Sequence, residues 1–154
     1  ADRIFVMDSG EIMQSGTPED IYANSSNPFV ANFIGMTNFI EGQVLDEDSI
    51  KVDNQQIAIN SHSYKKGTKV IIAARPEYVQ LAEKNSSNTF VGRVVDVEFL
   101  GSFLRIHLET SIMPDQPLIA DKPMIDNFSK SVAIGDDLNF TLSPNHLNVY
   151  ECDN

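Results

Sequence analysis

Two stretches of the chain share one order of elements, and this order decides the fold. The first copy comprises residues 42–44 (Gly-Gln-Val), 66–70 (Lys-Gly-Thr-Lys-Val) and 75–81 (Arg-Pro-Glu-Tyr-Val-Gln-Leu). The second comprises residues 92–94 (Gly-Arg-Val), 134–138 (Ile-Gly-Asp-Asp-Leu) and 143–149 (Ser-Pro-Asn-His-Leu-Asn-Val). In both copies the turn glycine precedes the proline by nine positions. Each copy therefore predicts a strand, a glycine turn, a strand, a proline turn and a last short strand.

Two related β units of this kind predict a mainly β fold, an OB-like small barrel or sandwich. The repeat is too long, and the copies too few, for a stacked solenoid. Two units that close on one another bury one face of each strand and give a barrel or a sandwich. Valines at 91, 95 and 97 and Phe99 are predicted to share one face of the strand that opens the second copy.

The second copy carries an insertion of about eighteen residues, between positions 110 and 131, that the first copy lacks. Pro114, Pro117 and Pro123 lie in it, and proline cannot donate to a strand ladder, so most of the insertion is predicted to be a loop. A long loop over a barrel mouth is a common place for function. It is also a place where insertions are tolerated, and the residues leave both interpretations open.

The chain before residue 38 has a different pattern, which predicts a short hairpin and two short helices. Asp8-Ser9-Gly10 has the composition of a hairpin turn. Thr17-Pro18 and Asn27-Pro28 are helix starts, with a capping side chain before proline at the first helical position. Phe29, Val30, Phe33 and Ile34 form one apolar stripe that needs a partner, either the β-domain or a domain body missing from the sequence. The abrupt start at Ala1 favours the second interpretation. The predicted division is residues 1–37 and residues 38–154.

Composition excludes several classes of protein. The chain has 154 residues, 42% of them hydrophobic and 21% charged, which is typical of a globular protein. No apolar run approaches the ~20 residues of a membrane span. The lone Cys152 excludes an internal disulfide framework and is typical of a reducing compartment. A formal net charge of −11 repels phosphate backbones, so no nucleic-acid partner is expected. The charge favours cationic ligands or basic partners, or it simply serves solubility.

No catalytic or metal-binding pattern is present in the sequence. A short segment, Lys66-Gly67-Thr68-Lys69, has residue types similar to those of a phosphate-binding loop. It lacks the first glycine of that motif and precedes a predicted strand instead of a helix. The three histidines and Cys152 lie in separate predicted segments without the spacing of metal ligands. We therefore expect no catalytic residue, no cofactor and no metal in this chain.

Arg75-Pro76-Glu77 is the best candidate for a functional contact. A strongly apolar strand ends in Arg75, whose planar guanidinium suits a carboxylate, a phosphate or the backbone carbonyls of a partner. One interpretation is a local Arg–Glu surface pair of little energetic value. The other is a contact with a neighbouring domain or subunit.

These motifs together resemble a known family. Residues 1–12, 16–22 and 27–35, followed by Asn38, are similar to the end of the ATP-binding subunit of bacterial ABC importers. The remainder resembles the C-terminal regulatory domain of these subunits, the TOBE domain, with Arg75-Pro76-Glu77 and Phe99-Leu100-Gly101 at characteristic positions. The resemblance implies that residues 1–37 are the remnant of a nucleotide-binding domain and that residues 38–154 are an OB-like regulatory domain.

The resemblance also implies what the chain does. Walker A, Walker B, the signature motif and the switch histidine would all lie upstream of Ala1, so the chain itself is expected not to be an enzyme. ATP and Mg would belong to the full-length ATPase. The implied partners are a second copy of the subunit and transmembrane permease subunits, and the implied location is the cytoplasmic face of the membrane. Arg75, Pro76, Glu77, Leu100 and Gly101 are the predicted inter-domain or dimer contacts.

Two other functions remain open from the residues. The first is a sensor for a small ligand, polyamine or oxyanion, held by the barrel or by the insertion at 110–131. The acidic balance favours a cationic effector, because an oxyanion would need basic groups gathered locally. The second is an OB-type nucleic-acid binder, which needs a basic groove with stacking aromatic side chains and is disfavoured by the net charge. The transported substrate is not readable from these residues.

Overall fold

A computed structural model of the protein describes residues 2–81, 88–124 and 132–152. The chain forms two compact units, Ala1–Thr37 and Asn38–Asn154, which we call the N-terminal unit and the β-domain. Each is described by itself. No helix in the described ranges has the length and hydrophobicity of a membrane span.

The N-terminal unit begins with the predicted hairpin. Strand β1 (Ile4–Asp8) pairs antiparallel with β2 (Glu11–Gly16). Ser9 and Gly10 form the turn with φ values of 51° and 84°. Two consecutive positive φ values are typical of the tight two-residue turn whose twist matches that of the flanking strands.

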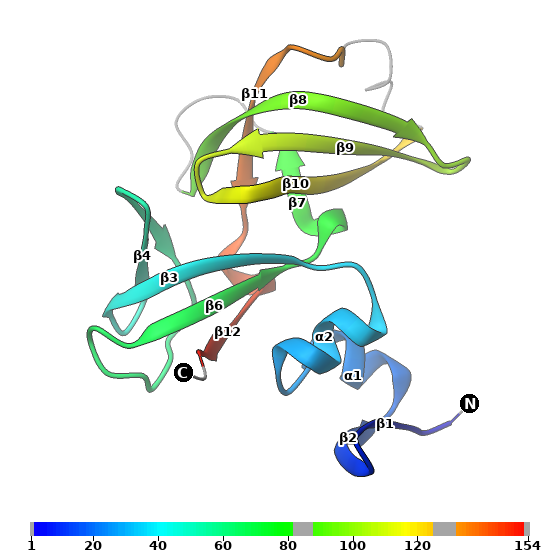
Figure 1. Ribbon diagram of the computed structural model, residues 1–154, viewed down its shortest axis with the longest axis vertical. Coiled ribbons are helices and arrows are strands. Elements are labelled where there is room, and N and C mark those ends of the chain that lie inside the picture. Colours follow the sequence, from blue (N-terminus) through cyan, green and yellow to red (C-terminus); the bar gives the residue numbers. More distant parts are fainter. Residues whose placement is uncertain (1, 82–87, 125–131, 153–154) are drawn as a thin grey trace. The chain divides into compact units, whose positions relative to one another are not determined.

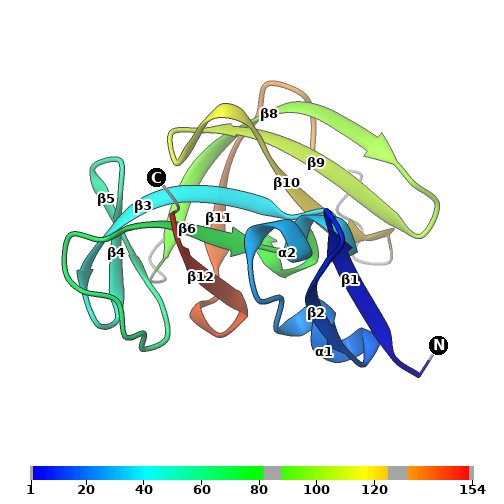
Figure 2. The same cartoon turned by 60° about the horizontal axis from the view of Figure 1, so that its bottom comes forward.

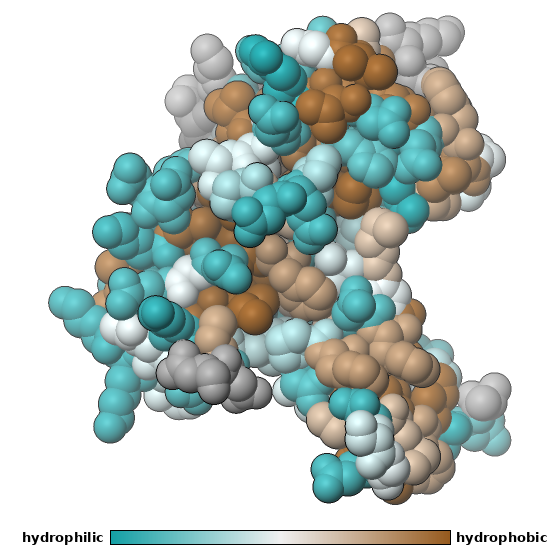
Figure 3. All heavy atoms as spheres, viewed as in Figure 1, coloured by the Kyte–Doolittle hydropathy of each residue, from teal (hydrophilic) through white to brown (hydrophobic). Residues whose placement is uncertain are grey.

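Two short helices complete this unit, each started by the predicted cap. Thr17 accepts a hydrogen bond from the backbone of α1 (Pro18–Ala23), and Asn27 accepts one from α2 (Pro28–Ile34). Only part of the predicted apolar stripe is buried: Val30 is buried, whereas Phe29 and Phe33 are exposed. The rings of Phe29 and Phe33 stack on one another, with centroids 6.1 Å apart. Hydrophobic side chains are visible on the surface over the two helices in Figure 3.

The β-domain contains two five-stranded antiparallel sheets (Figure 1). The first copy of the repeat supplies β3 (Asn38–Asp46), β4 (Ser49–Val52), β5 (Gln55–Ala58), β6 (Lys69–Ala74), the 3-10 helix η1 (Pro76–Tyr78) and β7 (Val79–Leu81). The second copy supplies β8 (Thr89–Phe99), β9 (Phe103–Thr110), β10 (Met113–Pro123), β11 (Asp137–Leu142), the 3-10 helix η4 (Pro144–His146) and β12 (Leu147–Glu151). The fold is mainly β and built from two related units, as the sequence predicts.

The two copies exchange their last strands. One sheet has the order β12-β6-β3-β4-β5 and the other β7-β11-β8-β9-β10, so β12 pairs with β6 and β7 pairs with β11. Figures 1 and 2 show β12 beside β6. The registers correspond: Val149 lies opposite Ile72 in one sheet, and Leu81 lies opposite Phe140 in the other. Because each copy completes the other's sheet, neither sheet exists without both copies.

The glycine turns repeat the same hydrogen bonds. The Gly67 N–H donates to the Val44 carbonyl oxygen at 2.9 Å, and the Gly135 N–H donates to that of Val94 at 2.8 Å. The φ values of 90° and 97° at these glycines are in the left-handed region, where a Cβ is strained. Between the sheets lies one core of aliphatic side chains, with Phe90 and Phe140 as its aromatic members.

Two expectations from the sequence are wrong. The insertion is not mostly loop: residues 113–123 form the edge strand β10, whose register is irregular between Met113 and Leu118. Pro114 and Pro117 lie in this irregular part, and Pro123 ends the strand, so none of them interrupts a regular ladder. Residues 125–131 lie outside the described ranges.

The predicted apolar face of β8 is wrong in part: of the four predicted residues, Val97 packs against the core. Val91 and Phe99 are exposed, whereas Phe90 and Val94 are buried. A register shift between Val94 and Asp96 adds a residue to β8, and a bulge of this kind moves the following side chains to the other face.

Candidate functional site

The predicted contact residues lie on two elements and differ in exposure. Arg75 and Pro76, at the start of η1, are buried, whereas Glu77 of the same helix is exposed. Leu100 and Gly101 form the exposed turn between β8 and β9, where Gly101 has a φ of 85°. Glu77, Leu100 and Gly101 are therefore the exposed members of the predicted set.

Arg75 acts inside the β-domain. Only 8% of the surface of Arg75 is exposed to solvent. Burial raises the pKa of the Tyr150 hydroxyl on β12, and the positive charge of Arg75 opposes that rise. Replacing Arg75 by Ala is therefore expected to weaken the fold as well as any contact, because it removes a buried charged side chain from its environment.

The two 3-10 helices meet at equivalent positions. The rings of Tyr78 on η1 and His146 on η4 stack in parallel, with centroids 4.0 Å apart and planes inclined by 9°. Tyr78 and His146 follow Gly67 and Gly135 by the same eleven positions. The stack therefore marks the place where the two copies face each other.

A pair of asparagines links the copies, and sequence reasoning missed both. Asn38 donates to the Ile119 carbonyl oxygen and accepts from the Ile119 N–H, both at 2.8 Å. Asn88 forms the same two bonds with Ala58, at 2.8 and 2.7 Å. Each side-chain amide thus satisfies the backbone of an outer strand, β10 or β5. The repeat contained a sequence signal for this pair, because each asparagine precedes the glycine of its strand, Gly42 or Gly92, by four positions.

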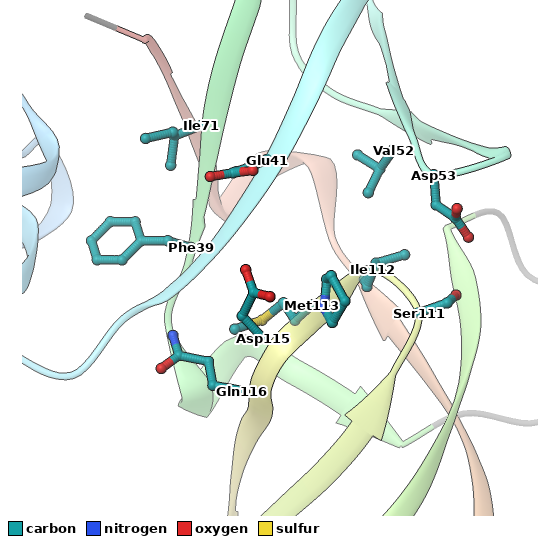
Figure 4. A pocket seen from close by; sticks show the side chains of 11 residues that line it. Phe39, Glu41, Val52, Asp53, Ile71, Ser111, Ile112, Met113, Asp115 and Gln116 are labelled. Carbon is teal, nitrogen blue, oxygen red and sulfur yellow. The ribbon is translucent and has the colours of Figure 1, made fainter. Parts of the chain in front are cut away.

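One hollow of the β-domain, the β3–β10 hollow, lies between β3, β6 and the start of β10 and has a volume of about 370 Å³. Its apolar lining includes Phe39, Ile71 and Met113. Three carboxylates also line it, those of Glu41, Asp53 and Asp115, together with Ser111 and Gln116. Figure 4 shows Phe39 on one side of this hollow and Asp53 on the opposite side, with Glu41 and Asp115 between them.

Strand alternation explains the composition of this hollow. Ile40 and Ile72 point into the core and are completely buried, so their neighbours Phe39, Glu41 and Ile71 point away from the core. Glu41 lies directly opposite Ile71 in the sheet. The hollow therefore combines an apolar sheet surface with carboxylates from three segments, and it is lined by residues 111–116 at the start of the predicted insertion.

A second hollow contains a buried hydroxyl group. Thr110 is 7% exposed, and its Oγ1 has no hydrogen-bond partner among the described residues. It lies near Arg93 and Asp137, which form an exposed ion pair at 3.5 Å. In the first copy the equivalent place, opposite the strand glycine, is occupied by Val52.

Replacing Thr110 by Val is expected to raise the free energy of unfolding by about 1 kcal/mol, because it removes a buried unpaired hydroxyl while keeping the shape of the side chain. Thr110→Ser is the matched control, since it keeps the hydroxyl and loses a methyl group, and it is expected to lower stability. Urea unfolding followed by circular dichroism measures both. Lower stability of the Val variant than of the natural chain would contradict the prediction.

The described residues offer no site for a metal ion. They include no group of three or more His, Cys, Asp or Glu side chains with suitable geometry. His62 accepts a hydrogen bond from the Tyr64 N–H at Nδ1, and His107 pairs with Glu98 at 2.7 Å, so both rings have local partners.

Comparison with known proteins identifies the family. Residues 72–149 match the TOBE domain family. A Spermidine/putrescine import ATP-binding protein PotA from Clostridium acetobutylicum is 29% identical over 149 residues, which cover 97% of this chain and 40% of the relative. The protein of the same name from Acetivibrio thermocellus is 32% identical with the same coverage. The Fe(3+) ions import ATP-binding protein FbpC 2 of Rhizobium meliloti is 34% identical over 133 residues, with 79% of this chain and 34% of the relative covered.

A solved structure shares the fold. The cytoplasmic molybdate-binding protein ModG, crystallised with molybdate, matches with a TM-score of 0.61 over 73% of this chain and 94% of its own, at 11% sequence identity. The fold is thus that of OB-like β-domains. The chain belongs to the TOBE domain family. It is similar to ATP-binding subunits of ABC importers and spans about 40% of the length of the first two of these relatives.

Proposed function

We propose that this chain is the C-terminal regulatory and dimerisation region of the ATP-binding subunit of an ABC importer. The observation that carries the proposal is the match of nearly the whole chain to part of such subunits, together with the TOBE domain within it. Residues 1–37 would complete the nucleotide-binding domain, and residues 38–154 would form the regulatory domain. Hydrolysis of ATP with Mg would be carried out by the longer protein and not by this chain.

The partners follow from the same proposal. Two subunits would associate through their β-domains, and permease subunits would hold the complex at the cytoplasmic face of the membrane. The acidic chain, at −11, is unsuited to a nucleic-acid partner. Glu77 and Leu100 are our candidates for the contact between subunits, because both are exposed and lie among the residues at characteristic positions of the family.

The contact is tested in the longer protein with the double variant Glu77→Ala/Leu100→Ala. Loss of an apolar anchor and a charge at an interface is expected to raise the dimer dissociation constant about tenfold. The matched control is Glu151→Ala/Ile134→Ala, which removes one exposed glutamate and one exposed aliphatic side chain elsewhere on the β-domain. Sedimentation analysis measures both. Equal dissociation constants for the two variants would remove Glu77 and Leu100 from the interface.

A second function is supported by a specific observation. The hollow with three carboxylates would allow the β-domain to sense a small ligand and transmit its presence to the ATPase. Of the two effector classes considered from the sequence, a polyamine suits this lining and an oxyanion does not, because the described lining contains no Lys or Arg.

A further inference from the structure

We propose that Lys122 is a positioning residue for the subunit contact: its buried ammonium group holds η1 in the place from which η1 presents Glu77. The use of this position in the contact rests on the function proposed above. Lys122 lies on β10, and only 8% of its surface is exposed. Its Nζ donates a hydrogen bond to the carbonyl oxygen of Val79, the residue that follows η1.

Lys122 occupies a position where strand alternation predicts an apolar residue. Alternate residues of β10 face the core, and Leu118 and Ala120 before it are completely buried. Across the ladder it lies opposite Leu104, which is also buried. The other lysines in the described part of the chain are exposed, at positions 51, 65, 66 and 69. An ammonium group is costly to take out of water without acceptors, so Lys122 requires partners such as the Val79 carbonyl oxygen.

The hydrogen bond joins the two edges of one sheet. In the order β7-β11-β8-β9-β10, Val79 begins β7 at one edge and pairs with Leu142 of β11. Lys122 lies near the end of β10, at the other edge. β10 contacts both β7 and η1 (Figure 1), although no ladder connects β10 with β7. A side-chain bond therefore closes this sheet where backbone pairing is absent.

The element that this bond fixes is η1. A 3-10 helix of three residues has few hydrogen bonds of its own, so its position depends on outside contacts. Lys122 holds the Val79 carbonyl oxygen at the end of η1. Directly before Val79 lie the exposed Glu77 and Tyr78, whose ring stacks on His146 at 4.0 Å between centroids. A shift of Val79 would therefore move Glu77 and separate the stacked rings.

The insertion supplies this anchor to one of the two 3-10 helices. Lys122 belongs to the insertion of the second copy, and its bond partner belongs to the first copy. The first copy lacks the insertion, so the repeat supplies no equivalent strand for η4. β10 thus distinguishes η1 from η4, which otherwise occupy equivalent positions of the repeat.

Nuclear magnetic resonance of the natural chain, isotope-labelled at lysine nitrogen and valine carbonyl carbon, tests the bond itself. We expect the Lys122 ammonium protons to exchange slowly with water and to show a coupling to the Val79 carbonyl carbon across the hydrogen bond. The exposed Lys51 is the internal reference, because an ammonium group in water exchanges fast. Exchange of Lys122 as fast as that of Lys51, without the coupling, would overturn the proposal.

Lys122→Met tests the positioning, because it removes the ammonium group and keeps a long apolar stem. We expect the Tyr78 and Val79 amides to exchange at least about tenfold faster, since a charge-assisted hydrogen bond is lost. The His146 ring signals should also lose the upfield shift caused by the Tyr78 ring. His107, which pairs with Glu98 in the same sheet, should keep its signals.

Lys51→Met is the matched control, since it removes an exposed lysine from the other sheet and is expected to change none of these signals. A Lys122→Met chain of lower stability with unchanged Tyr78 and His146 signals would show a purely structural lysine and would contradict the proposal. If that variant does not fold, the natural chain decides. Protection of the Tyr78 and Val79 amides and of the Lys122 ammonium group should then fall together with added urea, and independent loss would contradict the proposal.

The contact between subunits is measured in the longer protein. Lys122→Met is expected to raise the dimer dissociation constant about threefold and Lys51→Met to leave it unchanged. An unchanged constant in Lys122→Met, with a raised one in Glu77→Ala/Leu100→Ala, would overturn the role of Lys122 alone. Unchanged constants in both would instead contradict the proposed contact, and with it this use of Lys122.

Discussion

Replacing Asn88 by Ala is expected to lower the free energy of unfolding of the β-domain by about 3–5 kcal/mol. The side-chain amide forms three hydrogen bonds to backbone groups, two with Ala58 and one to the Leu142 carbonyl oxygen at 2.9 Å. Buried backbone groups that lose a partner cost about 1–3 kcal/mol each. Asn88 also has a φ of 58°, a conformation in which alanine is strained by roughly 1–3 kcal/mol.

Urea unfolding measures this loss, and two further variants separate its causes. Asn88→Gly relieves the backbone strain and keeps the loss of hydrogen bonds, so it is expected to retain most of the destabilisation. Asn38→Ala removes only two side-chain hydrogen bonds and is expected to cost about 2–3 kcal/mol. A Gly variant as stable as the natural chain would show that the hydrogen bonds to β5 and β11 contribute nothing. Native proteins are stable by only about 5–15 kcal/mol, so the Ala variant is expected to approach unfolding.

Gly42→Ala is expected to cost about 2–3 kcal/mol, because a new Cβ enters a filled space. That Cβ would lie 2.5 Å from Cγ2 of Ile50 and 2.9 Å from the backbone carbonyl oxygen of Lys51. The carbonyl belongs to the neighbouring strand β4 and moves only if the sheet moves. The strand glycine is therefore required by the close approach of β4.

The equivalent glycine provides the matched comparison for this variant. A Cβ at Gly92 would meet Cβ of Leu108 at 3.0 Å and the Phe140 ring at 3.3 Å, so Gly92→Ala is expected to cost about 1 kcal/mol. The midpoints of thermal unfolding should therefore rank natural chain, Gly92→Ala, Gly42→Ala in decreasing order. The reverse order of the two variants would contradict the packing argument.

The sequence predicts the strands, the turns and the helix starts well because their signals are local. The paired turn glycines, the two caps before proline and the Asp8-Ser9-Gly10 turn each depend on neighbouring residues and on backbone conformation. The exchange of β7 and β12 cannot be predicted from local signals. The alternation of polar and apolar residues in a short strand does not determine which sheet the strand joins. The bulge in β8 likewise arises from tertiary pairing, so the buried face of that strand was assigned to the wrong residues.

The candidate site was only partly predictable, for a similar reason. Arg75 follows the most apolar strand, and whether such an arginine is buried within the domain or presented to a partner depends on what packs over it. The hollow brings together Glu41 and Asp115, which are far apart in the sequence and were not named as candidates.

The rate of ATP hydrolysis by the longer protein, with and without residues 38–154, tests the proposed regulatory role most directly. We predict that removal of the β-domain leaves hydrolysis in place but abolishes its regulation, including any response to a polyamine. The variant Glu77→Ala/Leu100→Ala is expected to show a partial form of the same change. Hydrolysis that is regulated to the same extent without residues 38–154 would contradict the account.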